Sequence, residues 1–597
     1  MLTEEKLLNL REQYDSDEYT HLATDAIILQ ANVYLELPIN EYKYYGKRML
    51  NSTREGVCRL QTLSLAYLLT KNTRYLDRTK EEIIEAISVP SWNPSHFLDV
   101  AEIAIGLGFA YDWLFDELSN ELKQAIRKAL IDKAFVPSFG DDQLWISGSN
   151  NWNQVCHAGV SLAALAVGDE EPEWMEKIVS RAVENVPIAM EVSYAPAGVY
   201  PEGPMYWGYG TTYNIMLIDA LISALGSDFG LSNQIGFDKT ALYQFQMHGP
   251  DGNVFDYYDC GDTRYIGPPM IWLANHFNLV FLKNYVKQDS IQIFQQIVKS
   301  KQPSRSRYAS LSLLWENDCS QEDVDCRPEL DYFGNGINPV ASFRSSFDNP
   351  NAAWLAVKGG NNKNGHNHMD AGTFVFISQG VRWVSELGRE VYEDLERNKT
   401  NDLWKESERY NFLRLGPFGH STININNSLQ PFENISSPIT KFFSSANRSH
   451  AVIDTSGIWK EHAKSVKRGV ALLNKESVVI RDEIKGCDGD VTWQMITEAN
   501  VELVDNIAIL RKNNKTFIAE IVEPSKAVFQ AMSLKPTFEE ENKNEEFEKL
   551  GIKLDVKGDV NIVVHIYPEK MQSTQTSEYI ETLRNNPLDY WEIIKNC

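Results

Sequence analysis

The sequence predicts a multidomain α+β protein in which a helical N-terminal domain is followed by an antiparallel β-sandwich. Apolar residues recur at helical spacing from the N-terminus to about Leu314. After about Asp331 the pattern changes to short apolar runs separated by polar turns. The 597 residues are enough for two large domains, which we expect at residues 1–320 and 330–597, with the composition changing between them.

The N-terminal half contains successive amphipathic helices joined by short loops. In FLDVAEIAIGLGFAYDW, residues Leu98, Ala101 and Ile105 fall on one helical face, and NELKQAIRKAL carries a second such face. Ser119 is the predicted N-cap of this second helix. Short loops predict antiparallel helical hairpins, and a ring of hairpins is one way for this much helix to bury its apolar faces.

The apolar runs of the C-terminal half are predicted strands. They are rich in Val, Ile, Phe and Trp and are bounded by Gly, Asn and Asp. Many short strands without intervening helices favour an antiparallel sandwich. The runs are AAWLAVK, TFVFIS, VRWVSEL, SHAVIDTSG, RGVALLN, SVVIRDEI, VTWQMI and VNIVVHIYP.

Charge and composition argue against several classes of protein. The formal net charge of −25 and the lack of any basic run argue against nucleic-acid binding. No stretch has the length and apolarity of a membrane helix or of a signal peptide. The seven scattered cysteines, without a C-x-x-C pair, fit reduced thiols. We expect a cytoplasmic protein, with a periplasmic or secreted protein that has lost its signal as the alternative.

Four residues in the C-terminal half form a candidate metal site. His366 and His368 form an H-x-H pair before a predicted strand, and this spacing puts both side chains on one face of an extended backbone. A second strand ends at Glu386, and His420 follows in FGHSTININ. Imidazole nitrogen and carboxylate oxygen are ordinary zinc ligands. On spacing alone, surface histidines in a loop rich in Gly and Asn are the better supported alternative.

Two loop segments in the helical half are rich in amides and aromatic side chains. They are SGSNNWNQVCHAGV and YPEGPMYWGYGT. Such side chains can hydrogen-bond sugar hydroxyls and stack on sugar faces, and tyrosine can also transfer a proton. Packing between helices is the alternative for each aromatic residue, including Trp152 and Trp207.

These segments resemble the signature blocks of the heparinase II/III-like polysaccharide lyases. The blocks NNWNQVCHAG, PEGPMYWGYG, GHNHMDAGTFVF, VSELG and GHSTININ occur in the family's order, over roughly residues 95–500. The resemblance implies an N-terminal (α/α) toroid of helical hairpins as the catalytic domain. It also implies a C-terminal antiparallel β-sandwich with a zinc site and a catalytic histidine, and β-elimination on acidic, uronate-containing glycans.

The resemblance assigns catalytic roles to three residues. Asn151 matches the amide that neutralises the uronate carboxylate, while Tyr206 and His366 match the residues that divide the acid and base roles. Tyr209 is the near alternative to Tyr206. Some relatives have a histidine directly after the asparagine, where this sequence has Trp152.

The resemblance also implies a zinc ion with a structural role and a set of substrate contacts. The zinc ligands match His368, Glu386 and His420, although the relatives usually have Asp at the position of Glu386. The expected substrate-binding residues are Asn150, Trp152, Glu202, Trp207, Tyr209, Arg389 and Tyr410.

Heparin or heparan sulfate, as chains or oligosaccharides, is the expected substrate, and exo cleavage is one option. An alginate or oligoalginate lyase is the first alternative. A glycan-binding protein that keeps the fold without catalysis is the second, suggested by Trp152 and Glu386. The net charge opposes the approach of a polyanion and favours a short oligosaccharide entering a locally basic pocket. The oligomeric state stays open, with a homodimer among the options.

Overall fold

The computed structural model describes residues 2–261, 267–302, 307–316, 327–363, 365–571 and 575–591, without the side chains of residues 575–578. The chain divides into two compact units. The first comprises Met1–Ala195, Trp207–Ala241 and Ile266–Pro328, and the second comprises Pro196–Tyr206, Leu242–Tyr265 and Glu329–Cys597. Two segments from the helical half of the sequence therefore belong to the same unit as the strands.

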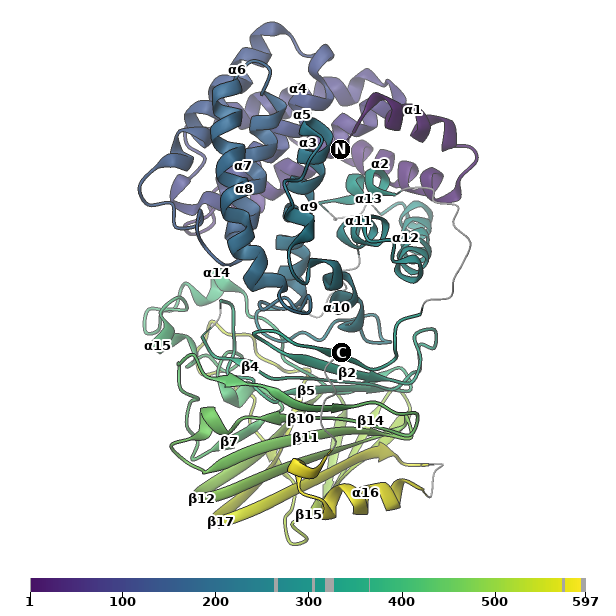
Figure 1. Ribbon diagram of the computed structural model, residues 1–597, viewed down its shortest axis with the longest axis vertical. Helices are drawn as coiled ribbons and strands as arrows, with labels where there is room; N and C mark the ends of the chain where they lie inside the picture. The colour runs from purple at the N-terminus through teal and green to yellow at the C-terminus, as the bar shows by residue number, and fades with distance from the viewer. Residues whose placement is uncertain are drawn as a thin grey trace. The chain divides into compact units, whose positions relative to one another are not determined.

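The first unit is built from helices, which Figure 1 labels. Helices α3, α5, α7 and α9 are buried over most of their surfaces, whereas α4, α6 and α8 bury mainly one face. The difference follows from composition, since α5 is apolar nearly all round and α6 is strongly amphipathic. The bounds are α1 (Glu4–Gln13), α2 (Glu18–Glu36), α3 (Leu50–Thr70), α4 (Thr73–Ser88), α5 (Phe97–Trp113), α6 (Asn120–Leu130), α7 (Asn151–Ala166), α8 (Pro172–Tyr194), α9 (Pro204–Leu225), α11 (Pro268–His276), α12 (Val280–Ser300) and α13 (Ala309–Trp315). Helix α10 (Thr240–Gln246) lies mostly in the second unit.

Small residues let the buried helices α5 and α7 approach closely. A Cβ atom at Gly159 would lie 2.6 Å from the carbonyl oxygen of Ala101. The predicted N-cap of α6 is also present, because the Ser119 hydroxyl accepts a hydrogen bond from the Leu122 N–H at 3.2 Å. Within the described ranges, no helix combines the length and apolarity needed to cross a membrane.

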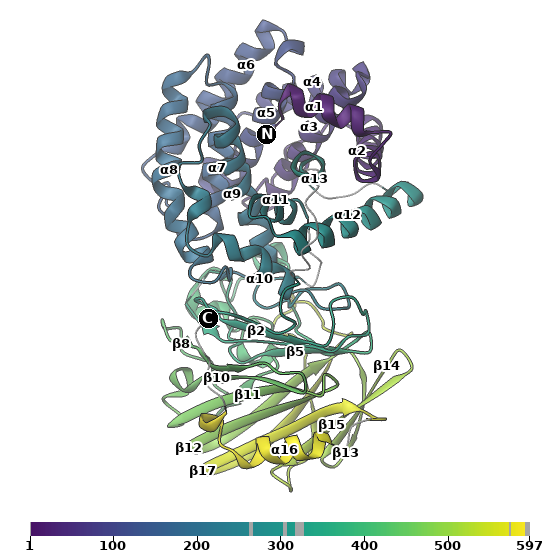
Figure 2. The ribbon, with the colours of Figure 1, turned by 45° about the vertical axis from the view of Figure 1, so that its right-hand side comes forward.

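The described part of the second unit contains two main antiparallel sheets, seen as separate layers in Figure 2, and a two-stranded sheet formed by β4 and β8. Of the two main sheets, the small sheet has the order β1-β2-β3-β5-β6, and the large sheet has the order β13-β14-β15-β17-β12-β11-β10-β9, with β7 and β16 paired to it. The bounds are β1 (Tyr332–Gly334), β2 (Val340–Arg344), β3 (Trp354–Lys358), β4 (Gly360–Asn361), β5 (Phe374–Ser378), β6 (Val381–Val384), β7 (Ile423–Ile425), β8 (Ser436–Ser437), β9 (Ile439–Phe443), β10 (Arg448–Asp454), β11 (Ser465–Leu473), β12 (Ser477–Thr497), β13 (Asn500–Val504), β14 (Ile507–Lys512), β15 (Lys515–Glu523), β16 (Gln530–Met532) and β17 (Glu548–Pro568).

The small sheet is buried on both faces. Leu355 and Phe376 belong to the core that it shares with the large sheet. The segment around Gly249 lies on the opposite face, where a Cβ atom at Gly249 would come within 2.6 Å of Ile377. Burial on both sides explains why β3 and β5 are continuous apolar runs and not alternating ones.

The predicted fold class, a toroid of helical hairpins followed by an antiparallel β-sandwich, is confirmed, with two differences of detail. SVVIRDEI and VTWQMI belong to one strand, β12, because a bulge between Ile484 and Cys487 lets the pairing with β17 continue. The second unit also contains short helices that were not predicted, α14 (Tyr392–Leu395), α15 (Glu406–Arg409) and α16 (Gln575–Asn585). Leu583 of α16 packs with Val479 and Val563 on the large sheet (Figure 2).

Candidate functional site

The loop between β4 and β5 carries both histidines of the H-x-H motif. The backbone is not extended at His366, whose φ is +59°. The carbonyl of His366 accepts a hydrogen bond from the Asp259 N–H at 3.1 Å. The His366 side chain keeps 14% exposure, whereas that of His368 is almost fully buried. His366 is therefore the histidine of the pair that solvent or a ligand can reach.

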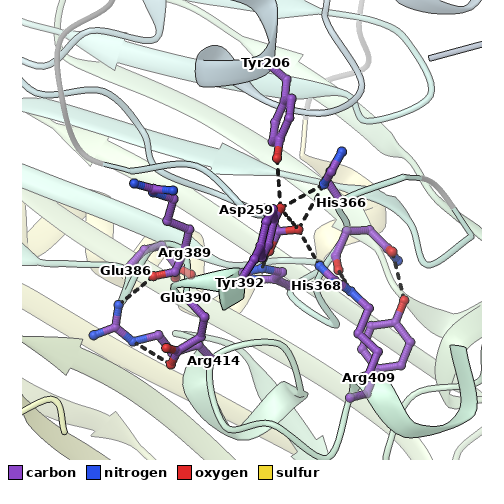
Figure 3. Close-up of polar contacts among 12 residues, drawn as sticks. Tyr206, Asp259, His366, His368, Glu386, Arg389, Glu390, Tyr392, Arg409 and Arg414 are labelled. Carbon is purple, nitrogen blue, oxygen red and sulfur yellow. Dashed lines mark hydrogen bonds and ion pairs between the residues drawn. The ribbon is translucent and has the colours of Figure 1, made fainter. Parts of the chain in front are cut away.

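Asp259 joins both histidines to two further side chains (Figure 3). Its Oδ2 accepts hydrogen bonds from Arg409 at 2.6 Å and from the Tyr392 hydroxyl at 2.7 Å. The same oxygen lies 3.2 Å from His366 Nδ1, and Oδ1 lies 3.0 Å from His368 Nε2. Burial alone would raise the pKa of Asp259, but Arg409 and the two histidines hold it well below its usual range. The ionised carboxylate orients the His366 ring through Nδ1, which leaves Nε2 for proton exchange.

Tyr206 lies against the exposed histidine. Its ring stacks on that of His366 with centroids 3.9 Å apart. Its hydroxyl is 2.8 Å from the hydroxyl of Tyr392, which donates to Asp259 (Figure 3). Burial, with the charge of Asp259 and the nearby Tyr206, raises the pKa of Tyr392 well above its usual value. The second unit thus holds a phenol and an imidazole side by side, both connected to one buried carboxylate.

The three residues of the predicted zinc site lie together in the second unit. The rings of His368 and His420 have centroids 5.3 Å apart. His420 Nδ1 is 2.5 Å from one oxygen of Glu386, and the other oxygen accepts a hydrogen bond from Thr373. Among the residues that the structure describes, buried His368 Nδ1 and His420 Nε2 have no hydrogen-bond partner.

The donor atoms fit a zinc site only in part. Two buried, unpartnered imidazole nitrogens are suitable ligands, but both oxygens of Glu386 already accept hydrogen bonds. Within the described residues, no three His, Cys, Asp or Glu side chains are arranged to hold a metal. A carboxylate that fixes the far nitrogen of a ligating histidine is common around metals, and Glu386 stands in that relation to His420.

Two of the other predicted residues of the second unit, Glu202 and Tyr410, lie against the histidine loop. Glu202 is buried, and a Cβ atom at Gly365 would lie 3.0 Å from its Oε1. Tyr410 is buried and donates its hydroxyl proton to Asn367 Oδ1 at 2.8 Å, which anchors the loop between the two histidines. The side chain of Arg389 is exposed.

Asn150, Asn151 and Trp152 lie at the start of α7 in the first unit. Asn150 caps the helix by accepting a hydrogen bond from the Trp152 N–H at 3.1 Å. Asn151 is buried, and the ring of Trp152 meets that of His96 edge-on with centroids 4.9 Å apart. The network around Asp259 is built from the second unit alone.

Trp207 and Tyr209 also belong to the first unit. The indole of Trp207 is buried and donates to the Thr240 hydroxyl at 2.8 Å. The Tyr209 hydroxyl donates to Glu102 at 2.9 Å. Both side chains therefore make the interhelical contacts that the sequence left open as an alternative to sugar binding.

Beside the site, buried Glu390 predicts a dependence of stability on pH. Its carboxylate lies 3.4 Å from Arg414, and burial raises its pKa to about 7. Since about 4.3 is usual for an unfolded chain, its stabilising effect is complete below that pH and is lost as the pH rises through about 7. Urea unfolding measures the free energy of unfolding of Glu390→Gln and of wild type. Between about pH 5 and about pH 8, the difference between them should change by about 2–3 kcal/mol in favour of the variant. An unchanged difference would contradict this assignment.

Comparison with known families connects the site to a group of lyases. Residues 343–573 match the family model described as "Heparinase II/III-like, C-terminal". This range contains His366, His368, Glu386, Tyr392 and His420. The resemblance drawn from the sequence motifs is confirmed over this part of the chain.

Solved structures share the fold at low sequence identity. A mutant of the heparan sulfate lyase HepC from Pedobacter heparinus has a TM-score of 0.56 and 14% identity, with 87% of this chain and 77% of that chain covered. A protein described as "Heparinase III-BT4657 gene product" has a TM-score of 0.56 and 14% identity, with 91% and 84% covered. At 14% identity, the similarity to these structures establishes a shared fold only. No curated protein matched the chain.

Proposed function

We propose that this protein is a polysaccharide lyase that cleaves uronate-containing acidic glycans by β-elimination, with heparin or heparan sulfate chains or oligosaccharides as its substrates. The observation that carries the proposal is the stacked pair of Tyr206 and His366, tied to the ionised carboxylate of Asp259. The family match over the histidine loop supports it, as does the fold shared with heparinases.

β-Elimination makes three demands on the side chains. A base removes the proton at C5 of the uronate, the C4–O4 bond breaks, and an acid protonates the departing O4. The electron pair of the C5–H bond forms the C4=C5 double bond. A hydrogen-bond donor to the uronate carboxylate makes C5 more acidic by stabilising the charge that develops there.

Tyr206 and His366 meet the proton-transfer demands. With Nδ1 held by Asp259, Nε2 of His366 can accept or donate a proton. The hydroxyl of Tyr206 can make the complementary transfer, because the Tyr392 hydroxyl, which donates to Asp259, lies 2.8 Å away and orients it by accepting its hydrogen bond. The amide of Asn151 is the proposed donor to the uronate carboxylate. The epimer of the uronate decides which residue is the base.

The test is an absorbance assay for the conjugated double bond of an unsaturated uronate. The purified protein is incubated with heparin, heparan sulfate, chondroitin, hyaluronan and alginate, each as polymer and as oligosaccharides. We expect product from heparin or heparan sulfate, and none from His366→Ala. If product forms only from alginate, the substrate is alginate and not heparin or heparan sulfate. Oligosaccharide binding without product from any glycan would overturn the lyase proposal in favour of a glycan-binding protein.

We further propose a structural zinc ion held by His368 and His420, with Glu386 as a third ligand or as the residue that orients His420. When bound, zinc would cross-link the loop before β5 to the loop before β7. We expect elemental analysis to find about one zinc per chain, and a chelator to lower the melting temperature. His420→Ala should lose the metal, whereas His462→Ala, a matched change at a partly exposed histidine, should keep it. Metal-free wild type with an unchanged melting temperature would contradict the proposal.

A further inference from the structure

A charged cluster in the first unit takes no part in the chemistry above. Its centre is Glu102 of α5, which is fully buried. Glu102 Oε1 lies 2.6 Å from Arg307 Nη1 and 3.3 Å from Arg54 Nε, and it accepts the Tyr209 hydroxyl at 2.9 Å. The Tyr213 hydroxyl donates to the other oxygen. Two arginines and two tyrosines thus converge on one carboxylate.

The cluster carries an unbalanced positive charge. Burial would raise the pKa of Glu102, but Arg307 and Arg54 keep it below its usual value, so the carboxylate is ionised. Burial and the Glu102 charge raise the pKa values of Tyr209 and Tyr213 well above normal, so both phenols are neutral. One negative and two positive charges leave one guanidinium without a counter-charge inside the cluster. A partly desolvated cation is stabilised by an anionic ligand.

Both arginine side chains remain partly accessible. The side chains of Arg54 and Arg307 keep 31% and 20% exposure, while Glu102 beneath them has none. Both lie over the ring of Tyr209, at 4.7 and 5.1 Å from its centroid. Planar guanidinium donors held by a carboxylate and an aromatic ring are suited to a carboxylate or sulfate, which they can bind through paired hydrogen bonds.

Arg127 of the first unit provides a contrast, because its charge is balanced. Arg127 has 19% exposure, close to that of Arg307, but it lies within 4 Å of two carboxylates, those of Glu170 and Glu171. The chain as a whole has a net charge of −25. Two arginines that share one carboxylate are therefore a local excess of positive charge on a chain that is acidic overall.

We propose that Arg54 and Arg307 form a subsite that binds an acidic group of the sugar substrate, either a uronate carboxylate or a sulfate ester. The identity of the sugar rests on the proposed lyase function, but the binding of an anion does not. Glu102 acts as a positioning residue that holds the two guanidinium groups together. The subsite would supply the local positive charge that a strongly acidic protein needs to hold a polyanion.

The test is calorimetric titration of the intact protein with a heparan sulfate tetrasaccharide, with its fully desulfated counterpart and with inorganic sulfate. We expect Arg54→Gln and Arg307→Gln each to weaken tetrasaccharide binding about tenfold or more, because each removes charge-assisted hydrogen bonds. Arg127→Gln is the matched control and should bind as wild type does. If the arginine variants lose affinity only for the sulfated ligands, the subsite binds a sulfate group. If they lose affinity equally for the desulfated tetrasaccharide, the subsite binds a uronate carboxylate.

Arg54→Lys and Arg307→Lys serve if the glutamine variants fail to fold. Since they keep the charge but lose the paired donors, they should weaken binding by a smaller factor. Wild-type affinity in folded Arg54 and Arg307 variants would overturn the subsite. Wild type could also release no unsaturated product while the Arg54 and Arg307 variants bind the tetrasaccharide more weakly than wild type does. This result would refute the lyase function but support the subsite.

Discussion

Asp259→Asn is expected to lower the free energy of unfolding by about 3–5 kcal/mol, the usual loss when one partner of a buried ion pair is removed. Arg409 is buried, and its guanidinium lies 2.6 Å from the Asp259 carboxylate. An amide at position 259 could still accept a hydrogen bond from Arg409 but would not neutralise its charge. The variant would also give His366 and His368 a neutral neighbour.

The sign of the pH dependence follows from the depressed pKa of Asp259. Its stabilising effect is complete above the unfolded value of about 3.9 and is lost as the pH falls through the lower folded value. The difference between wild type and Asp259→Asn should therefore be largest near neutral pH and shrink in acid. Urea unfolding at several pH values measures it.

Asp589→Asn provides the control for this prediction. Asp589 pairs with Lys467 at 2.5 Å but keeps 52% exposure, so its loss should cost about 1 kcal/mol or less. If the two substitutions lowered the free energy of unfolding equally, Asp259 would not form a stabilising buried ion pair with Arg409. Activity gives a second measurement, since the loss of an ionised carboxylate on Nδ1 should also reduce turnover through His366.

The sequence alone predicted the elements whose signals are local. Continuous apolar runs correctly indicated β3 and β5, and helical spacing correctly indicated α5 and α6. The H-x-H pair marked the histidine loop because two histidines at that spacing are conspicuous in any sequence. Each of these inferences needed fewer than about twenty neighbouring residues.

The residues that connect the site were missed because their signal is not local. Asp259 lies 107 positions before His366, in the segment that covers the small sheet. Only the fold brings this aspartate to the histidine loop, and neither aspartate of YYDCGD belongs to a recognisable motif. Tyr392 begins the unpredicted helix α14. The two tyrosines directly before Asp259 are the nearest local signal in the sequence.

Tyr206→Phe is expected to lower kcat by about 10² to 10⁴, the range for losing a positioned proton-transfer group. Tyr392→Phe should lower kcat by about tenfold or less, because it removes one hydrogen bond behind Tyr206 and leaves His366 in contact with Asp259. The two variants therefore separate a residue that exchanges a proton with the sugar from one that positions it.

The measurement for the two tyrosines is the rate of unsaturated-uronate formation across a range of pH. Tyr206→Phe should lose activity at every pH, whereas Tyr392→Phe should keep activity with a displaced pH profile. Tyr567→Phe is the control, because the Tyr567 hydroxyl contacts only Glu520 of the large sheet among its described hydrogen-bond partners, at 3.0 Å. If Tyr392→Phe proves inactive while Tyr206→Phe retains turnover, the proton passes through Tyr392, and the stacked Tyr206 ring serves to hold His366 in place.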